Sequence, residues 1–232
     1  MIGRILNKVT QAGLDNNTII VFFSDNGGLN YNFTFGRSPA LVADKQYLYA
    51  GDSLLYLVTS NSPLRGVKGN LYEGGIRVPM IVKYPKKWKH AAVVNDIVSS
   101  VDFFPSFVGL AGGKMPSGQD FDGVDLFHGK RSNDRPLFWH YPVFHHGVPA
   151  SAVRLGDWKL IRNLADSTYE LYNLKNDPGE TANLATARPA QLAKLSALLD
   201  HWLKEMKAPM PVPNPKFDEK RRSLGGRVPL RF

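Results

Sequence analysis

The stretch that decides the fold is Thr18-Ile-Ile-Val-Phe-Phe-Ser-Asp-Asn-Gly-Gly28, an apolar run that ends in a polar, glycine-containing turn. The run is rich in β-branched and aromatic residues and does not alternate with polar ones, which is typical of a β-strand covered on both faces. Before it, apolar residues recur at helical spacing from Ile2 to Val9 and Gly13 follows, which predicts a short amphipathic helix. A helix, a buried strand and a polar turn in this order indicate an α/β fold, in which functional groups lie beyond the carboxyl ends of the strands.

The remaining elements fall into two regions. In the first we expect a second buried strand at residues 78–84 and a helix that begins at Asp102. In the second we expect a tight hairpin at Gly156-Asp157 and a helix that begins at Pro189, whose apolar stripe should close over an antiparallel sheet. The strands predicted for this sheet span residues 137–141, 151–155, 158–162 and 169–174.

The change of pattern after residue 115 gives the expected domain organisation. Residues 1–115 should form an α/β part, residues 116–207 an antiparallel α+β part, and residues 208–232 a basic, proline-rich tail. The formal net charge is +9, but residues 204–232 contain eight basic and only three acidic residues. Residues 204–232 therefore carry +5 of the +9, and a charge gathered at one end of the chain does not indicate a nucleic-acid partner.

Composition excludes several kinds of site. The chain has 232 residues, of which 43% are hydrophobic and 21% charged, as expected of a globular protein with a core. It contains no cysteine, which excludes disulfides, thiolate metal sites and a cysteine nucleophile within this sequence. No apolar run approaches the roughly 18 residues that are needed to cross a membrane.

Three groups of residues are candidates for function. Asp25 and Asn26 follow the first strand and offer two adjacent oxygen ligands, as Ca²⁺ or Mg²⁺ prefers, although an Asx turn also explains them. Lys68 lies between Gly66 and Gly69, where it could meet an anion together with main-chain N–H groups, or could simply be solvated. His140, His145 and His146 cluster near a strand end and could bind metal or substrate, or could be structural.

Five ordered blocks give these candidates a common context. They are the blocks at residues 13–28, 63–79, 101–106, 156–161 and 170–180, and they include Ser-Asp-Asn-Gly-Gly, Arg-Gly-Val-Lys-Gly, Tyr-Glu-Gly-Gly, Gly-Asp-Trp-Lys-Leu-Ile and Asp-Pro-Gly-Glu. Their succession resembles the C-terminal portion of the arylsulfatase-type sulfatases, formylglycine-dependent enzymes of the alkaline phosphatase superfamily. The resemblance implies part of an alkaline-phosphatase-like mixed sheet with flanking helices, followed by a smaller antiparallel sheet packed by a helix.

The resemblance also implies roles. Asp25 and Asn26 would complete a calcium site, and Lys68 would be the catalytic lysine that contacts the sulfate near the leaving oxygen. A cation at each place stabilises charge that develops in the transition state. The histidines His140, His145 and His146 would contact the substrate, a sulfated small molecule or glycan.

Other parts of such a site are not in this sequence. The family makes its formylglycine nucleophile from a Cys-x-Pro-Ser-Arg motif, or a serine version of it, and neither occurs here. We therefore expect a truncated sulfuric ester hydrolase that acts on a carbohydrate or aryl sulfate ester and whose full-length parent is periplasmic or secreted. This chain should hold only half of a calcium site and show no turnover alone. The alternatives are a non-catalytic remnant that binds calcium or sulfated glycans, and a phosphodiesterase or phosphonate hydrolase of the same superfamily.

Overall fold

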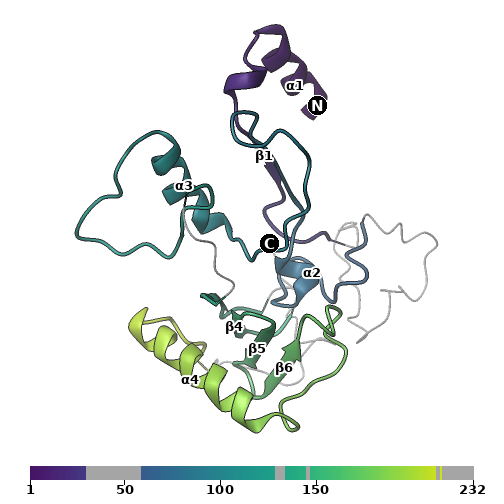
Figure 1. The fold of residues 1–232 in the computed structure, drawn as a ribbon. Helices are drawn as coiled ribbons and strands as arrows, with labels where there is room; N and C mark the ends of the chain where they lie inside the picture. Colours follow the sequence, from purple (N-terminus) through teal and green to yellow (C-terminus); the bar gives the residue numbers. More distant parts are fainter. Residues whose placement is uncertain (30–58, 129–133, 145–146, 213–214, 216–232) are drawn as a thin grey trace, which may run out of the picture.

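The computed structural model describes residues 1–29, 59–128, 134–144, 147–212 and 215. Within these stretches the chain forms a two-stranded sheet, a four-stranded sheet and α-helices, in a mixed α/β arrangement (Figure 1). None of the helices in these stretches combines the length and the apolar character needed to cross a membrane. The elements are α1 (Ile2–Gln11), β1 (Ile20–Phe23), α2 (Glu73–Ile76), β2 (Met80–Lys83), α3 (Phe103–Leu110), β3 (Pro136–Tyr141), β4 (Ala150–Leu155), β5 (Trp158–Asn163), β6 (Tyr169–Asn173) and α4 (Pro189–Glu205).

The four-stranded sheet is antiparallel throughout, with the strand order β3-β4-β5-β6. The hairpin between β4 and β5 turns at Gly156, whose φ of +58° lies in the left-handed region that glycine adopts without a steric penalty. In this register Leu155 pairs with Trp158, as a two-residue hairpin requires. The predicted strands and the predicted hairpin of this sheet are confirmed.

Both faces of the four-stranded sheet are covered. On one face, Val153, Leu160 and Leu171 are fully buried against α4, as the apolar stripe from Pro189 onward predicts. Because side chains alternate along a strand, their neighbours point to the opposite face, where they pack against Leu71 and Tyr72. The residues of α4 that enter the core are Leu195, Leu199 and Leu203, one turn apart on the same helical face.

The two-stranded sheet pairs β1 with β2 in antiparallel fashion, and Phe22 lies opposite Ile81. The sequence predicts strands covered on both faces, but Phe22 is 46% exposed and Ile81 is 65% exposed. No residue of α1 is buried, so the apolar stripe of this helix does not cover the strands. The prediction that both faces of these strands are covered is therefore wrong for the described residues. An apolar run shows that a strand can be buried, but it does not show that another segment covers it.

α3 begins at a buried aspartate that also ties this helix to a distant segment. The Ser99 N–H donates to Asp102 Oδ2 at 2.8 Å, within a capping box at the start of the preceding turn. Asp102 Oδ1 accepts a hydrogen bond from the Val124 N–H at 3.0 Å, and Arg135 forms an ion pair with the same carboxylate. The helix predicted after Asp102 is confirmed, but the Asp102 side chain makes no capping hydrogen bond to α3 and instead bonds to Ser99, Val124 and Arg135.

Candidate active site

The turn after β1 lies directly against the glycine-rich loop of residues 63–75. The Gly27 N–H donates a hydrogen bond to the Gly75 carbonyl at 2.9 Å, and the Lys68 N–H donates to the Gly28 carbonyl at 3.3 Å. These main-chain bonds join the two segments that carry Asp25, Asn26 and Lys68. The structure therefore brings the turn of Asp25 and Asn26 next to the loop of Lys68, which lies more than 40 positions further along the sequence.

Asn61 reinforces the same junction with its side-chain amide. Its Oδ1 accepts a hydrogen bond from the Gly28 N–H at 2.9 Å, and its Nδ2 donates to the Gly28 carbonyl at 2.9 Å and to the Gly66 carbonyl at 3.1 Å. One side chain thus satisfies three main-chain groups from two loops. Sequence analysis missed Asn61, since an isolated asparagine before a proline resembles any other turn residue.

The glycines of both motifs permit this close contact. A Cβ added to Gly27 would lie 1.7 Å from the Gly74 carbonyl oxygen. One added to Gly74 would lie 2.4 Å from the Gly66 carbonyl oxygen, and one added to Gly75 would lie 2.3 Å from the Asn70 carbonyl oxygen. No other residue fits these positions without moving the backbone, so the paired glycines are explained by packing of main chain against main chain.

The predicted calcium ligands lie on this junction. Asp25 is exposed and Asn26 is half-buried, with its Nδ2 donating to the Gly27 carbonyl at 2.9 Å. Calcium takes six to eight oxygen ligands, as a rough rule. Among the described residues, no group of three or more His, Asp or Glu side chains could hold a metal ion. The described part of the chain by itself therefore does not fit a complete calcium site.

Of the three predicted histidines, only His140 lies within the described residues. His140, on β3, has both ring nitrogens engaged, Nδ1 with Ser151 Oγ at 2.8 Å and Nε2 with the Pro209 carbonyl at 2.8 Å. It thereby fastens the segment after α4 to the four-stranded sheet. His145 and His146 lie outside the described residues, and substrate contact by all three histidines stays a prediction.

A buried charge cluster lies beneath the junction, at the start of α2. Lys159 Nζ on β5 is 3.0 Å from Glu73 Oε1 and 2.8 Å from Glu180 Oε1. The Glu73 N–H also donates to Glu180 Oε2 at 2.6 Å. All three side chains are at most 1% exposed, and burial raises the pKa of Glu180. Sequence analysis assigned these residues no role, although each belongs to one of the five blocks.

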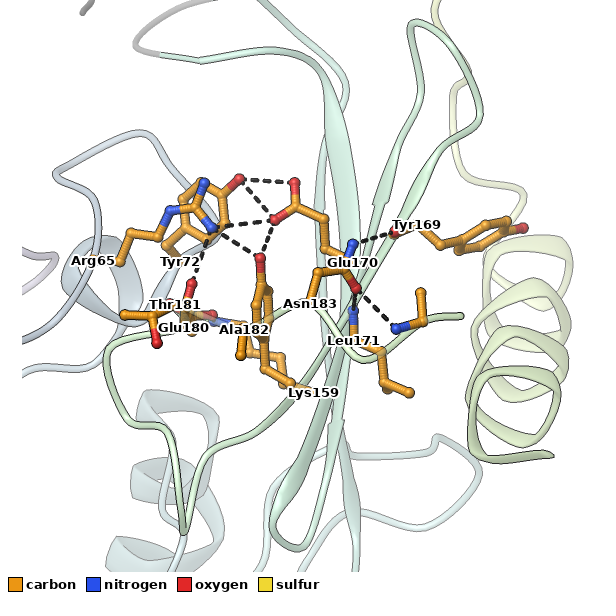
Figure 2. Close-up of polar contacts among 12 residues, drawn as sticks. Arg65, Tyr72, Lys159, Tyr169, Glu170, Leu171, Glu180, Thr181, Ala182 and Asn183 are labelled. Atoms are coloured by element: carbon orange, nitrogen blue, oxygen red, sulfur yellow. Dashed lines mark hydrogen bonds and ion pairs between the residues drawn. The ribbon is translucent and has the colours of Figure 1, made fainter. Parts of the chain in front are cut away.

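A second polar cluster extends from the first toward the surface. Figure 2 shows Arg65 and Tyr72, from the glycine-rich loop, directed at Glu170 on β6. The Tyr72 hydroxyl donates to Glu170 Oε1 at 2.9 Å, and the Tyr172 hydroxyl also donates to this carboxylate. Arg65 Nη1 donates to the Tyr172 hydroxyl at 2.8 Å and to the Glu180 carbonyl at 3.1 Å. Burial and the nearby Glu170 carboxylate raise the pKa of Tyr72, so its hydroxyl remains a donor.

The fold is that of a known family. Residues 67–209 match the model of the C-terminal part of N-sulphoglucosamine sulphohydrolase, and residues 1–113 match the sulfatase model. The chain belongs to the sulfatase family and corresponds to its C-terminal portion. The resemblance found in the sequence is thereby confirmed, together with the alkaline-phosphatase-like fold that it implies.

Individual relatives support the same assignment. A sulfatase of Formosa agariphila is 33% identical, over 96% of this chain and 42% of the relative. The N-acetylglucosamine-6-O-sulfatase of Bacteroides thetaiotaomicron is 31% identical, over 89% of this chain and 34% of the relative. The chain therefore spans less than half the length of the curated relatives that it matches.

Two solved structures add ligands to the comparison. Ps i-CgsB in complex with k-i-k-neocarrahexaose is 25% identical with a TM-score of 0.67, over 87% of this chain and 40% of that one. BT4656 in complex with its substrate D-glucosamine-2-N,6-O-disulfate is 28% identical with a TM-score of 0.56, over 89% of this chain and 38% of that one. Both neighbours bind carbohydrates.

Proposed function

We propose that this chain is the C-terminal portion of a sulfuric ester hydrolase that removes sulfate from a carbohydrate. The observation that carries the proposal is the hydrogen bond from the Lys68 N–H to the Gly28 carbonyl, which holds the lysine loop beside the turn of Asp25 and Asn26. A sulfated glycan or sugar is the favoured substrate, because one relative is named for N-acetylglucosamine 6-sulfate and a structural neighbour holds a glucosamine disulfate.

In this proposal Lys68 is the catalytic group that the chain contributes. Its ammonium faces the oxygen that leaves with the sugar, and it stabilises the negative charge that this oxygen gains as the S–O bond breaks. Removing one such contact raises a barrier by about 2.7–4 kcal/mol. Main-chain bonds on both sides of the junction fix the loop before substrate arrives, so little ordering entropy is lost on binding.

Asp25 and Asn26 are proposed to supply two oxygen ligands to Ca²⁺, which would neutralise the sulfate oxygens when bound. The other ligands and the formylglycine nucleophile have to come from outside the described residues. His140, His145 and His146 are proposed to line the sugar side of the site. Because the sequence contains no formylglycine motif, the purified 232-residue chain should release no sulfate from an aryl sulfate.

Titration calorimetry tests the sulfate contact. N-acetylglucosamine 6-sulfate should bind more tightly than unsulfated N-acetylglucosamine, and Lys68→Ala should weaken binding of the sulfated sugar at least tenfold, on the order of one lost charged contact. Lys175→Ala removes an exposed lysine of the four-stranded sheet region and serves as the matched control. Equal affinity for the two sugars, or equal behaviour of the two variants, would contradict the proposal.

Thermal unfolding tests the calcium ligands. Millimolar Ca²⁺ should raise the melting temperature of the wild-type chain, since a ligand that binds only the folded state stabilises it. Asp25→Ala should abolish this rise, whereas Asp120→Ala, at an exposed aspartate after α3, should retain it. A rise that survives Asp25→Ala would reject the assignment of Asp25 as a ligand.

A further inference from the structure

We propose that Lys159, with Glu73 and Glu180, is a positioning residue that holds the Lys68 loop and the Asp25 turn together. The four-stranded sheet is then a working part of the active site and not an appendage to it. This inference rests on the proposed function, because the loops that it concerns are those of the proposed site.

The buried charge cluster of Lys159, Glu73 and Glu180 holds Glu73 at a fixed distance from β5. Lys159 Nζ contacts a carboxylate oxygen of Glu73 at 3.0 Å and one of Glu180 at 2.8 Å, and none of the three side chains is more than 1% exposed. The second oxygen of Glu73 is 3.7 Å from Arg154 Nη1 and 3.8 Å from Arg77 Nη1. A buried ion that leaves its partner has no water to replace it, so these contacts resist sliding in a way that apolar packing does not.

Glu73 is the first residue of α2, so the contacts that hold its side chain also hold the start of this helix. Its N–H donates to Glu180 Oε2 at 2.6 Å, so both its main chain and its side chain are held from the side of the four-stranded sheet. The next residue, Gly74, donates its N–H to the Arg65 carbonyl at 2.6 Å. α2 is therefore fixed between the charge cluster and the loop of Lys68, as its central place in Figure 1 illustrates.

The same helix reaches the Asp25 turn. The Gly75 carbonyl accepts a hydrogen bond from the Gly27 N–H at 2.9 Å, and a Cβ on Gly27 would overlap the Gly74 carbonyl oxygen. The two main-chain segments are in direct contact, so a movement of α2 is passed on to the turn. A shift of α2 on the order of 1 Å would therefore displace both loops, and displacements of this size at a reacting centre are costly.

Hydrogen–deuterium exchange tests this positioning role without a ligand. In Lys159→Met, amides of residues 24–29 and 63–77 should exchange about tenfold faster or more, while amides in the core of β4 and α4 keep their wild-type rates. Arg162→Met is the matched control, since it removes an ion pair of the same strand that joins β5 to Asp200 of α4, at 2.8 Å, instead of to α2. It should leave the two loops unchanged.

Glu180→Gln provides a second variant that keeps Lys159 in the sheet. It should also accelerate amide exchange in the same two loops. Equal acceleration at all protected amides in both variants would show a role in global stability alone and would overturn the inference, as would unchanged exchange at the loops. Because this measurement uses no sulfated sugar, its failure is separate from a failure of sulfate binding. When the chain binds the sulfated sugar and the charge cluster positions the loops, Lys159→Met and Glu180→Gln should also weaken N-acetylglucosamine 6-sulfate binding, and Arg162→Met should not.

Discussion

Gly27→Ala should separate the two loops of the proposed site. The added Cβ would lie 1.7 Å from the Gly74 carbonyl oxygen, although carbon atoms in such contacts essentially never come closer than 3.0 Å. The turn or α2 must therefore move by more than 1 Å, which costs about 1–3 kcal/mol as overpacking. Losing the 2.9 Å hydrogen bond from the Gly27 N–H to the Gly75 carbonyl adds about 0.5–1.5 kcal/mol. The sum of about 1.5–4.5 kcal/mol corresponds to a melting temperature lower by roughly 3–18 °C for a chain of this size.

Circular dichroism melts and hydrogen–deuterium exchange measure this effect. Gly3→Ala is the matched control, because a Cβ at Gly3 in α1 has no atom within 4 Å and alanine favours a helix. Gly27→Ala should lower the melting temperature and expose the amides of residues 24–29 and 63–77, whereas Gly3→Ala should leave both unchanged or raise the melting temperature slightly. Wild-type stability and exchange in Gly27→Ala would show that the close approach of the two loops does not exist in solution, and the geometric basis of the site would then fail.

Three further predictions concern the rest of the molecule. Leu199→Ala should destabilise the chain by about 2–5 kcal/mol in urea unfolding, because Leu199 is fully buried between α4 and the sheet; a loss below 1 kcal/mol would contradict this packing. Desolvation raises the pKa of Asp177, but N–H groups of Ala182 and Thr181 outweigh it and lower the pKa below 3.8. Asp177→Asn should therefore lower the melting temperature at pH 7, with a deficit that shrinks as pH falls through the folded-state pKa; a deficit independent of pH would refute this. Because Phe22 is 46% exposed on β1, the chain should self-associate as its concentration rises in sedimentation velocity, and Phe22→Thr should reduce this association; a wild-type chain that stays monomeric, or association that Phe22→Thr leaves unchanged, would contradict this.

The antiparallel part of the fold was predictable because its determinants are local. Its strands read as short apolar runs of period two, Gly156-Asp157 marks the hairpin, and Pro189 marks the start of a helix with an apolar stripe. The exposure of β1 and β2 was not predictable in this way. A run such as residues 18–23 shows that a strand can be buried, but whether anything covers it depends on segments elsewhere.

For the candidate site, sequence analysis selected the polar groups of the glycine motifs and missed the buried charged groups next to them. Asp25, Asn26 and Lys68 stand in motifs with glycines, which mark special backbone. The contact between Lys159 and Glu73 joins positions 86 residues apart, and a lone lysine or glutamate in a sequence resembles a solvated residue. His140 shows the opposite difficulty, since a histidine at a strand end resembles a ligand while both of its nitrogens bond to this chain.

The buried charges also bear on the predicted division of the chain near residue 115. Two independently folding domains of one chain usually share a rather polar interface. Here Glu73 from the first part and Lys159 from the second are at most 1% exposed, and an uncompensated charge at that depth costs several kcal/mol. Separating the two parts would therefore leave Glu73 and Lys159 without the partner that compensates their charge. In a fragment of residues 1–115, Glu73 should therefore lack its partner Lys159. The amides of residues 63–77 should lose their protection from hydrogen exchange in this fragment, even though it contains the whole glycine-rich loop.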